Sequence, residues 1–472
     1  MKKRFWLNLI LIFILVLSFS LNINVYETKA QSFASYVSGI TIQNLETSQA
    51  TVTVDYYNQS GTVAHQTTDT IPAFGVKDYA TIPTSSGFQG SVVISSTNKI
   101  AAVSTLRGDN RGRGAYIGMS EGATTAVLPV LMKNWGSSSW NTWFAVQNIG
   151  TGDATITVNY AACPGNSDKE VTGVKPKSMV TFSQSTETCF TSSKVLTSAV
   201  VTSNQPIIIV VSQESTIVNS SLVSQGFTAG DTNPVIPLMN SNNPDTSGWR
   251  TAISVFNMGT QDTTITMTYV RANDGSTCTE TQTIPSQQSK IFAGNSLIVG
   301  APAGVTLTCP VGQRLVGSAY VSNNTNSQPL AVTVNQDRGT LSSAYAGFSP
   351  SSATPKVVFP QIQDRNGAAS QWASSFMIFN VGSSPTYVKC TFTNTSYTAQ
   401  SGALAPLKAW EDLQRGKIAS SYVGSGECTA YTNSSYTTID TSARIVGVVN
   451  IRGTGTGLFD LMMSYEGINV TP

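Results

Sequence analysis

An eleven-residue phrase recurs in this 472-residue chain at intervals too long for a solenoid. Residues 140–150 read WNTWFAVQNIG, residues 249–259 read WRTAISVFNMG, and residues 372–382 read WASSFMIFNVG, while residues 36–44 carry a degraded copy, YVSGITIQN. The steps between the asparagines are 104, 109 and 123 residues. Solenoid repeats run about 20–50 residues, so steps of this length indicate whole domains. The residues that define the repeat are Tyr36, Asn44, Trp140, Asn148, Gly150, Trp249, Asn257, Gly259, Trp372, Asn380 and Gly382.

Each copy has the pattern of an antiparallel β-sandwich. In the second copy, β-forming residues 142–147 lead to an Asn-x-Gly turn at 148–150, and residues 154–160 then alternate small or apolar with polar side chains. Period-two alternation is typical of a half-buried strand, and Asn and Gly tolerate the backbone of tight turns. No amphipathic helix of three turns is predicted after residue 30. About seven short strands in about 105 residues favour a sandwich.

The first thirty residues have the composition of a secretory signal. Lys2, Lys3 and Arg4 precede an apolar stretch over 5–21, and a small-residue cleavage site ends at Ala30. An uncleaved N-terminal anchor is the alternative; if the signal is cleaved, the mature chain is expected to have no membrane span. The predicted organisation is a signal peptide over 1–30 followed by four sandwiches over 31–126, 127–234, 235–356 and 357–472.

The cysteines predict disulfides and an oxidising compartment. Spacings of 26, 31 and 38 residues exclude a CxxC motif, and a chain with one His offers few further metal ligands. We expect three intradomain disulfides, each contributing about 3–4 kcal/mol through loop closure, and none in the degenerate first domain. The three pairs are Cys163 with Cys189, Cys278 with Cys309, and Cys390 with Cys428.

The charges and the catalytic side chains exclude two classes of function. Removing four basic and one acidic residue with the signal leaves 23 basic and 24 acidic residues, which provides no basic face for nucleic acid. Residues 118–122 match the G-x-S-x-G hydrolase elbow, but that motif needs a following helix and a His base, and His65 is the single His. We therefore expect no enzyme activity, no cofactor and no metal.

Two further motifs have plain structural interpretations. The repeated aromatic residue favours a core or domain-junction role, whereas Trp143 and Trp410 do not recur and are the candidate exposed glycan contacts. Arg-Gly occurs at 107–108, 338–339 and 452–453, which are corresponding places in three copies, and predicts a repeated turn.

The recurring phrase, followed by Ala-Thr-(Ile/Val)-Thr-Val-x-Tyr at 50–56 and 154–160, resembles the tandem Ig-like or fibronectin-like repeats of bacterial secreted and cell-surface proteins. The resemblance covers residues 36–472 and implies an all-β chain of four tandem antiparallel β-sandwich (Ig-like) domains. Repeats of this kind serve as stalks, adhesins, filament subunits and enzyme appendages, so the resemblance leaves the function open. The cysteine pairs do not match the inter-sheet disulfide of antibody domains.

These observations favour a secreted or extracellular, cell-surface-associated, non-enzymatic protein with a structural or adhesive role. Its four domains are expected to lie in a row, with self-association or a cell-envelope polysaccharide as the partner. The alternative is an array of carbohydrate-binding modules. Copies two to four begin with a Pro-bearing strand that copy one lacks, and a spare strand at 468–472 suggests head-to-tail strand donation. The alternative interpretation is that this last strand belongs to the fourth domain.

Overall fold

The computed structural model describes residues 35–108, 112–163, 168–244, 248–292, 304–310, 312–455 and 462–471. The fold is all-β, with antiparallel sheets throughout, as the strand periodicity predicts. The predicted signal peptide, residues 1–30, lies outside the described residues. Within the described ranges, no helix has the length and apolar composition needed to cross a membrane.

The strands form four consecutive sets, called repeats 1 to 4 here, and every sheet lies within one repeat. Repeat 1 comprises β1 (Tyr36–Asn44), β2 (Ala50–Asn58), β3 (Val63–Ile71), β4 (Val76–Tyr79), β5 (Gly90–Ser96), β6 (Ile100–Gly108) and β7 (Gly112–Ile117). Repeat 2 comprises β8 (Ala123–Lys133), β9 (Asn141–Asn148), β10 (Ala154–Tyr160), β11 (Lys169–Val174), β12 (Met179–Ser183), the 3-10 turn η2 (Gln184–Thr186), β13 (Val195–Ser215) and β14 (Ser220–Gln225). Since β8 begins at Ala123, the domain boundary predicted at 126/127 falls inside a strand.

The last two repeats contain more strands. Repeat 3 comprises β15 (Val235–Ser241), β16 (Arg250–Asn257), β17 (Thr263–Arg271), β18 (Thr277–Ile284), β19 (Ser289–Phe292), β20 (Thr306–Leu307), β21 (Leu315–Asn324), η3 (Thr325–Ser327), β22 (Leu330–Arg338) and β23 (Leu341–Ala346). After η4 (Pro350–Ser352), repeat 4 comprises β24 (Lys356–Asp364), β25 (Ala373–Asn380), β26 (Thr386–Phe392), β27 (Thr398–Leu404), β28 (Ala409–Leu413), β29 (Tyr422–Tyr431), β30 (Ile445–Arg452), β31 (Met462–Glu466) and β32 (Ile468–Val470).

One four-stranded arrangement occurs in every repeat. Its order is β4-β1-β6-β7 in repeat 1, β19-β16-β22-β23 in repeat 3 and β28-β25-β30-β31 in repeat 4. In repeat 2 the same order, β12-β9-β13-β14, uses the second half of β13, a 21-residue strand whose first half pairs with β10 and β8. We call this the inner sheet; the remaining strands of each repeat form its outer sheet, and apolar side chains fill the space between the two layers.

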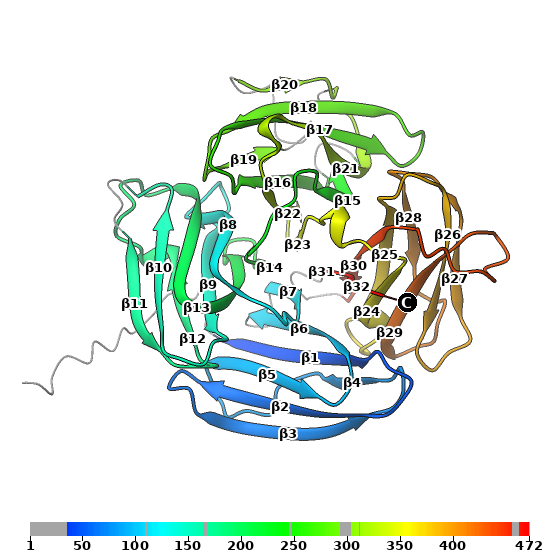
Figure 1. Ribbon diagram of the computed structural model, residues 1–472, viewed down its shortest axis with the longest axis horizontal. Helices are drawn as coiled ribbons and strands as arrows, with labels where there is room; N and C mark the ends of the chain where they lie inside the picture. Colours follow the sequence, from blue (N-terminus) through cyan, green and yellow to red (C-terminus); the bar gives the residue numbers. More distant parts are fainter. Residues whose placement is uncertain are drawn as a thin grey trace, which may run out of the picture.

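The four repeats close into a ring rather than lying in a row (Figure 1). The last strand of each inner sheet lies nearest the middle, so that β7 contacts β14, β14 contacts β23, β23 contacts β31, and β31 contacts β7. Gly114 on β7 makes one of these approaches possible, because a Cβ there would lie 2.2 Å from Cγ2 of Val223 on β14. The expectation of a linear row is therefore wrong: the first and fourth repeats are direct neighbours.

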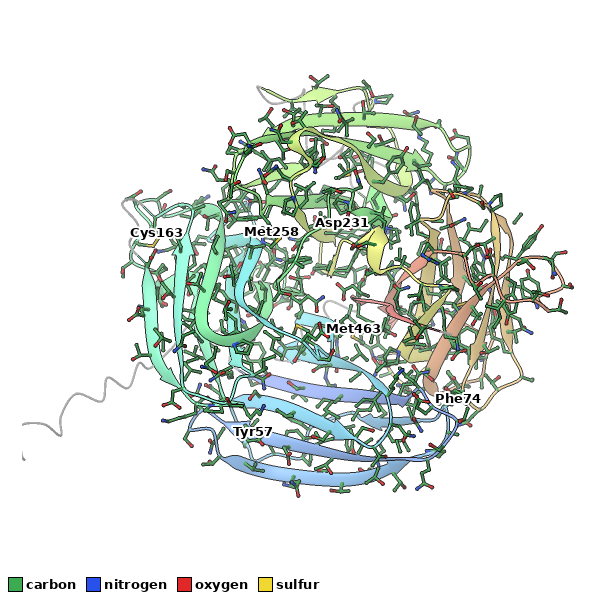
Figure 2. The ribbon with its side chains drawn as sticks, in the orientation of Figure 1. Tyr57, Phe74, Cys163, Asp231, Met258 and Met463 are labelled. Carbon is green, nitrogen blue, oxygen red and sulfur yellow. A yellow bond between two sulfur atoms is a disulfide. The ribbon has the colours of Figure 1, made fainter. Side chains whose placement is uncertain are left out.

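Apolar contacts hold the junctions between repeats. Val127, Phe256 and Ala331 form a buried cluster between repeats 2 and 3, where Met258 also lies (Figure 2). The core of repeat 3 continues into β25 and β30 of repeat 4, and the core of repeat 4 includes Val103 of repeat 1. Burying such surface stabilises each junction by about 25 cal/mol per Å² of apolar area.

Polar side chains fix the register at the same junctions. Gln213 and Asn335 exchange amide hydrogen bonds of 2.7 and 3.3 Å between repeats 2 and 3. At the closing junction, Nε2 of Gln361 donates to Oγ1 of Thr41 at 2.9 Å across 320 residues of sequence. The side-chain amides of Gln213, Asn335 and Gln361 find these partners in a neighbouring repeat, so the bonds favour the closed ring.

The C-terminal strand is already paired within its own repeat. Ile468, Asn469 and Val470 of β32 lie opposite residues 356–358 of β24. Similar single bridges join Phe227 to Val127 in repeat 2 and Phe348 to Val235 in repeat 3. The interpretation of residues 468–472 as a spare donor strand is therefore wrong, and the alternative, that this strand belongs to the fourth repeat, holds.

All three predicted disulfides are present. They join Cys163 to Cys189, Cys278 to Cys309, and Cys390 to Cys428. Their positions differ between repeats: Cys390 and Cys428 lie directly opposite each other on β26 and β29, whereas Cys163 follows the end of β10. The bridges are thus separate reinforcements of the outer sheets and not one conserved framework position.

Candidate functional site: charged groups at the ends of the central hairpins

The repeated asparagine is a buried hydrogen-bonding clamp. The side-chain amide of Asn257 donates to the carbonyls of Gln261 at 2.7 Å and Ile284 at 3.2 Å, and its Oδ1 accepts from the amide of Gly259 at 2.9 Å. One side chain thereby ties the end of β16 to the following turn and to the end of β18. Equivalent bonds are made by Asn44, Asn148 and Asn380, and each side chain is at most 1% exposed.

Glycine stands two residues after the clamp asparagine in three repeats, and in repeats 2 and 3 a glutamine side chain approaches it closely. A Cβ on Gly150 would lie 2.3 Å from Oε1 of Gln205, and one on Gly259 would lie 1.9 Å from Oε1 of Gln328. Gly382 donates its amide to the clamp of repeat 4 in the same way. These framework residues shape a turn and leave no room for a ligand.

The repeated aromatic residues do not form a row of equivalent sites. Trp372 is buried, and the guanidinium of Arg113 from repeat 1 lies 4.8 Å from its ring centroid, so it is a junction residue. Trp140 and Trp249 are partly exposed, and each pairs with the loop before its strand. Tyr36 is also partly exposed and lies at the junction of repeats 1 and 2.

Trp143 and Trp410, the two candidate glycan contacts, are less exposed than the sequence predicts. Trp143 is 9% exposed: its ring meets Tyr36 edge to face at 5.7 Å, and its indole N–H donates to Oε1 of Glu214 at 2.7 Å. The expectation that Trp143 is exposed is wrong, because repeat 1 covers the side of β9 that faces away from the core. Trp410 is partly buried and packs edge to face on Phe376 with centroids 5.4 Å apart.

Charged residues occupy one corresponding position in all four repeats. Each clamp asparagine lies opposite a residue of the third inner-sheet strand, and this pairing aligns the four repeats. The aligned position near the end of that strand holds Arg107, Glu214, Asp337 and Arg452 in repeats 1 to 4. The predicted Arg-Gly turns lie here, at the hairpins that bring the chain into the middle of the ring, although Arg338 is one residue later in the register.

In repeat 2 the position is a buried carboxylate. Glu214 is 1% exposed and accepts three hydrogen bonds of 2.7 Å, from the hydroxyl of Tyr36, the indole of Trp143 and the hydroxyl of Ser212. Such donors replace the water that a carboxylate loses on burial. Glu214 therefore joins repeats 1 and 2 and is closed to ligands.

In repeats 3 and 4 the same end of the ring gathers arginines. Arg415 donates through Nη2 to the carbonyls of Gln371 at 2.8 Å and Arg452 at 3.3 Å. Burial lowers the pKa of Arg452, and the positive charges of Arg338 and Arg415 lower it further, so the charges of the three side chains interact. We call Arg338, Arg415 and Arg452 the arginine cluster.

The arginine cluster is accessible and lacks a described counter-charge. Arg338 and Arg452 are exposed and Arg415 is partly exposed. Within the parts of the chain that the structure describes, none of the three forms an ion pair, whereas the neighbouring Arg250 is paired with Asp337 at 2.9 Å. Adjacent like charges repel, and an anion bound between them relieves that repulsion. The cluster is thus suited to carboxylate, sulfate or phosphate groups.

Sequence reasoning found the Arg-Gly turns but not the cluster. The available signal was the arginine that recurs near the central hairpins. The sequence does not show that the ring brings the arginines of repeats 3 and 4 together. No group of three or more His, Cys, Asp or Glu side chains suited to a metal ion occurs among the described residues. No protein-family model matches the chain, and no curated protein matches it.

Proposed function

We propose that the chain is a secreted, non-enzymatic adhesive protein whose four tandem Ig-like β-sandwich domains form a closed ring that binds an acidic polysaccharide of a cell envelope. The observation that carries this proposal is the arginine cluster, three neighbouring guanidinium groups without a described counter-charge at one end of the ring. Guanidinium groups bind carboxylates through paired N–H donors, which makes them suited to uronic acid units.

The surroundings of the cluster support a polymeric ligand. Arg338 lies at the end of β22 in repeat 3, whereas Arg415 and Arg452 belong to repeat 4. A ligand that contacts all three therefore spans the junction between repeats 3 and 4. Three disulfides in repeats 2 to 4 suit an oxidising exterior.

The direct test is binding of polygalacturonate, with dextran as the uncharged comparison. The double variant Arg338→Gln/Arg452→Gln is expected to weaken polygalacturonate binding by at least about 100-fold, since two hydrogen-bonded charged contacts of about 1.5–3 kcal/mol each are lost. Binding of the wild-type protein should also fall steeply as salt rises, because the contacts are ionic.

Arg444→Gln is the matched control. Arg444 is exposed and directly precedes β30, whereas Arg452 ends that strand, so the two arginines lie about 26 Å apart at about 3.3 Å per residue. The control should bind polygalacturonate like the wild type. Equal loss in the control, or equal binding of dextran, would show that the cluster is not the site.

The alternative function, an array of carbohydrate-binding modules, is less well supported. It needs exposed aromatic side chains on corresponding faces, but Trp143 is covered by repeat 1 and Trp410 packs on the core of repeat 4. Trp140 and Trp249 remain partly exposed, so Trp249→Ala tests this alternative. Loss of dextran binding in that variant would favour it.

A further inference from the structure

The outer sheet of repeat 1 has an open edge where the other repeats have a strand. In repeats 2, 3 and 4, the Pro-bearing strands β8, β15 and β24 pair with β13, β21 and β29, and we call them the lead strands. The corresponding strand of repeat 1 is β5, which pairs with β2. No described residue pairs with the other edge of β5.

Apolar side chains along this edge are incompletely covered. Val92 lies opposite Tyr56, as Ala199 lies opposite Tyr160 and Ala319 opposite Tyr269. Ala199 and Ala319 are at most 1% exposed beneath their lead strands, whereas Val92 is partly exposed. Ile94 differs in the same way from its counterparts, which are buried: Val201, Val321 and Cys428. The edge of β5 thus carries apolar side chains like those that a lead strand covers in the other repeats, but no described strand covers them here.

A tyrosine on the central hairpin binds the lead strand in repeats 3 and 4, and repeat 1 has the corresponding tyrosine. The hydroxyl of Tyr345 donates to the carbonyl of Leu238 and accepts from its amide at 3.3 Å; Leu238 directly follows the lead-strand proline. Tyr465 makes the same pair of bonds with Gln361, at 2.5 and 3.3 Å. Tyr116 occupies the corresponding position on β7, because it lies opposite Ser104 as Tyr345 lies opposite Val334.

The sequence before β1 has a segment at the matching distance. The lead strands place Ile236, Leu238 and Met239 at 21, 19 and 18 residues before Asn257. Phe359, Gln361 and Ile362 lie at the same distances before Asn380. At those distances before Asn44 stand Ile23, Val25 and Tyr26, all β-forming residues.

We propose that residues 21–28 of this chain pair with β5 as the lead strand of repeat 1. Met239 lies opposite Gly317 in repeat 3 and Ile362 lies opposite Gly424 in repeat 4. The same register in repeat 1 would place Ile23 opposite Val92 and Tyr26 opposite Gly90. Val25 would then present its backbone amide and carbonyl to the hydroxyl of Tyr116.

This assignment has a consequence for export. Cleavage after Ala30, the site that the signal pattern predicts, would remove the strand and leave the edge of β5 open. The assignment therefore requires that the mature chain retain residues 21–28, through cleavage before Leu21 or through an uncleaved anchor. It stands independently of any ligand of the arginine cluster.

The test is a cysteine pair, Ile23→Cys with Val92→Cys, in the exported full-length chain. Directly opposite residues share a face of the sheet, so a disulfide within one chain is expected. Asn22→Cys with Val92→Cys is the control, because a neighbouring residue points to the other face and should not crosslink. Mass spectrometry of the same samples gives the N-terminal residue. An N-terminus at Gln31, or crosslinks only between two chains, overturns the proposal.

A second pair of variants avoids new cysteines. Asn24 stands where Pro237 and Pro360 stand, so Asn24→Pro should leave hydrogen exchange in β5 unchanged. Tyr26→Pro removes an amide from the proposed pairing and should speed exchange of the outward-facing β5 amides by about 100-fold or more. Equal exchange in the two variants overturns the proposal.

Discussion

The hydroxyl of Tyr36 lies 2.7 Å from Oε2 of Glu214, although 178 residues separate the two in sequence. The other carboxylate oxygen accepts from the indole of Trp143, whose ring meets that of Tyr36 edge to face. The first strand of repeat 1 is thereby joined to the central hairpin of repeat 2 through one buried charge. Because a buried carboxylate is costly without its donors, this group acts as a lock between the repeats.

Replacing Tyr36 by Phe should destabilise the protein without altering its fold. The change removes one hydrogen bond to a buried charge, so the free energy of unfolding is expected to fall by about 1.5–3 kcal/mol in urea titration. Tyr57→Phe is the control: Tyr57 lies on β2 of the same repeat (Figure 2), and its hydroxyl has no hydrogen-bond partner among the described residues. Equal effects of the two substitutions would contradict the lock.

Ring closure predicts a compact particle in solution. For about 440 residues the radius of gyration of a compact chain is about 22 Å, whereas four domains in a row would give roughly 40 Å or more. Small-angle X-ray scattering on monomeric protein separates these values directly. Gln361→Ala with Thr41→Ala, which removes the bond closing repeat 4 onto repeat 1, is expected to increase the radius if closure depends on that junction.

What the sequence predicted depended on local patterns. The all-β class follows from period-two alternation within single strands, and each disulfide joins cysteines inside one repeat. The ring depends instead on contacts such as Gln361 with Thr41, across 320 residues, for which alternation carries no signal. The linear arrangement and the spare C-terminal strand were predicted wrongly for this reason.

Trp143 illustrates the same limit at one residue. On β9, Phe144 and Val146 face the core, so alternation places Trp143 on the opposite face and predicts exposure. That face is covered by Tyr36 of another repeat, which no property of β9 reveals. The arginine cluster was missed because its members gain meaning only through the junction of repeats 3 and 4.

The asparagine clamp should be essential to stability in every repeat. Asn257→Ala leaves the buried carbonyl of Ile284 and the amide of Gly259 without partners, so the free energy of unfolding should fall by about 3 kcal/mol or more. Asn273→Ala, at an exposed turn of the same repeat, should cost less than about 1 kcal/mol. A smaller loss at Asn257 than at Asn273 would show that the clamp is dispensable.

Glu466 should make stability depend on pH. It is buried at the end of β31, where it accepts from the amide of Ala346 in repeat 3, and burial raises its pKa from the ordinary 4.5 to about 7. The folded state therefore binds a proton more tightly than the unfolded state, so the free energy of unfolding falls as pH rises from about 4.5 through about 7.

Glu466→Gln keeps the acceptor for Ala346 but removes the charge. The variant should match the wild type near pH 4 and exceed it above pH 7 by up to about 3 kcal/mol, measured by urea unfolding. Glu170→Gln, at an exposed position of β11, is the control and should change stability little. A gain at Glu466 that is equally large at pH 4 and pH 8 would mean that it comes from packing and not from the buried charge.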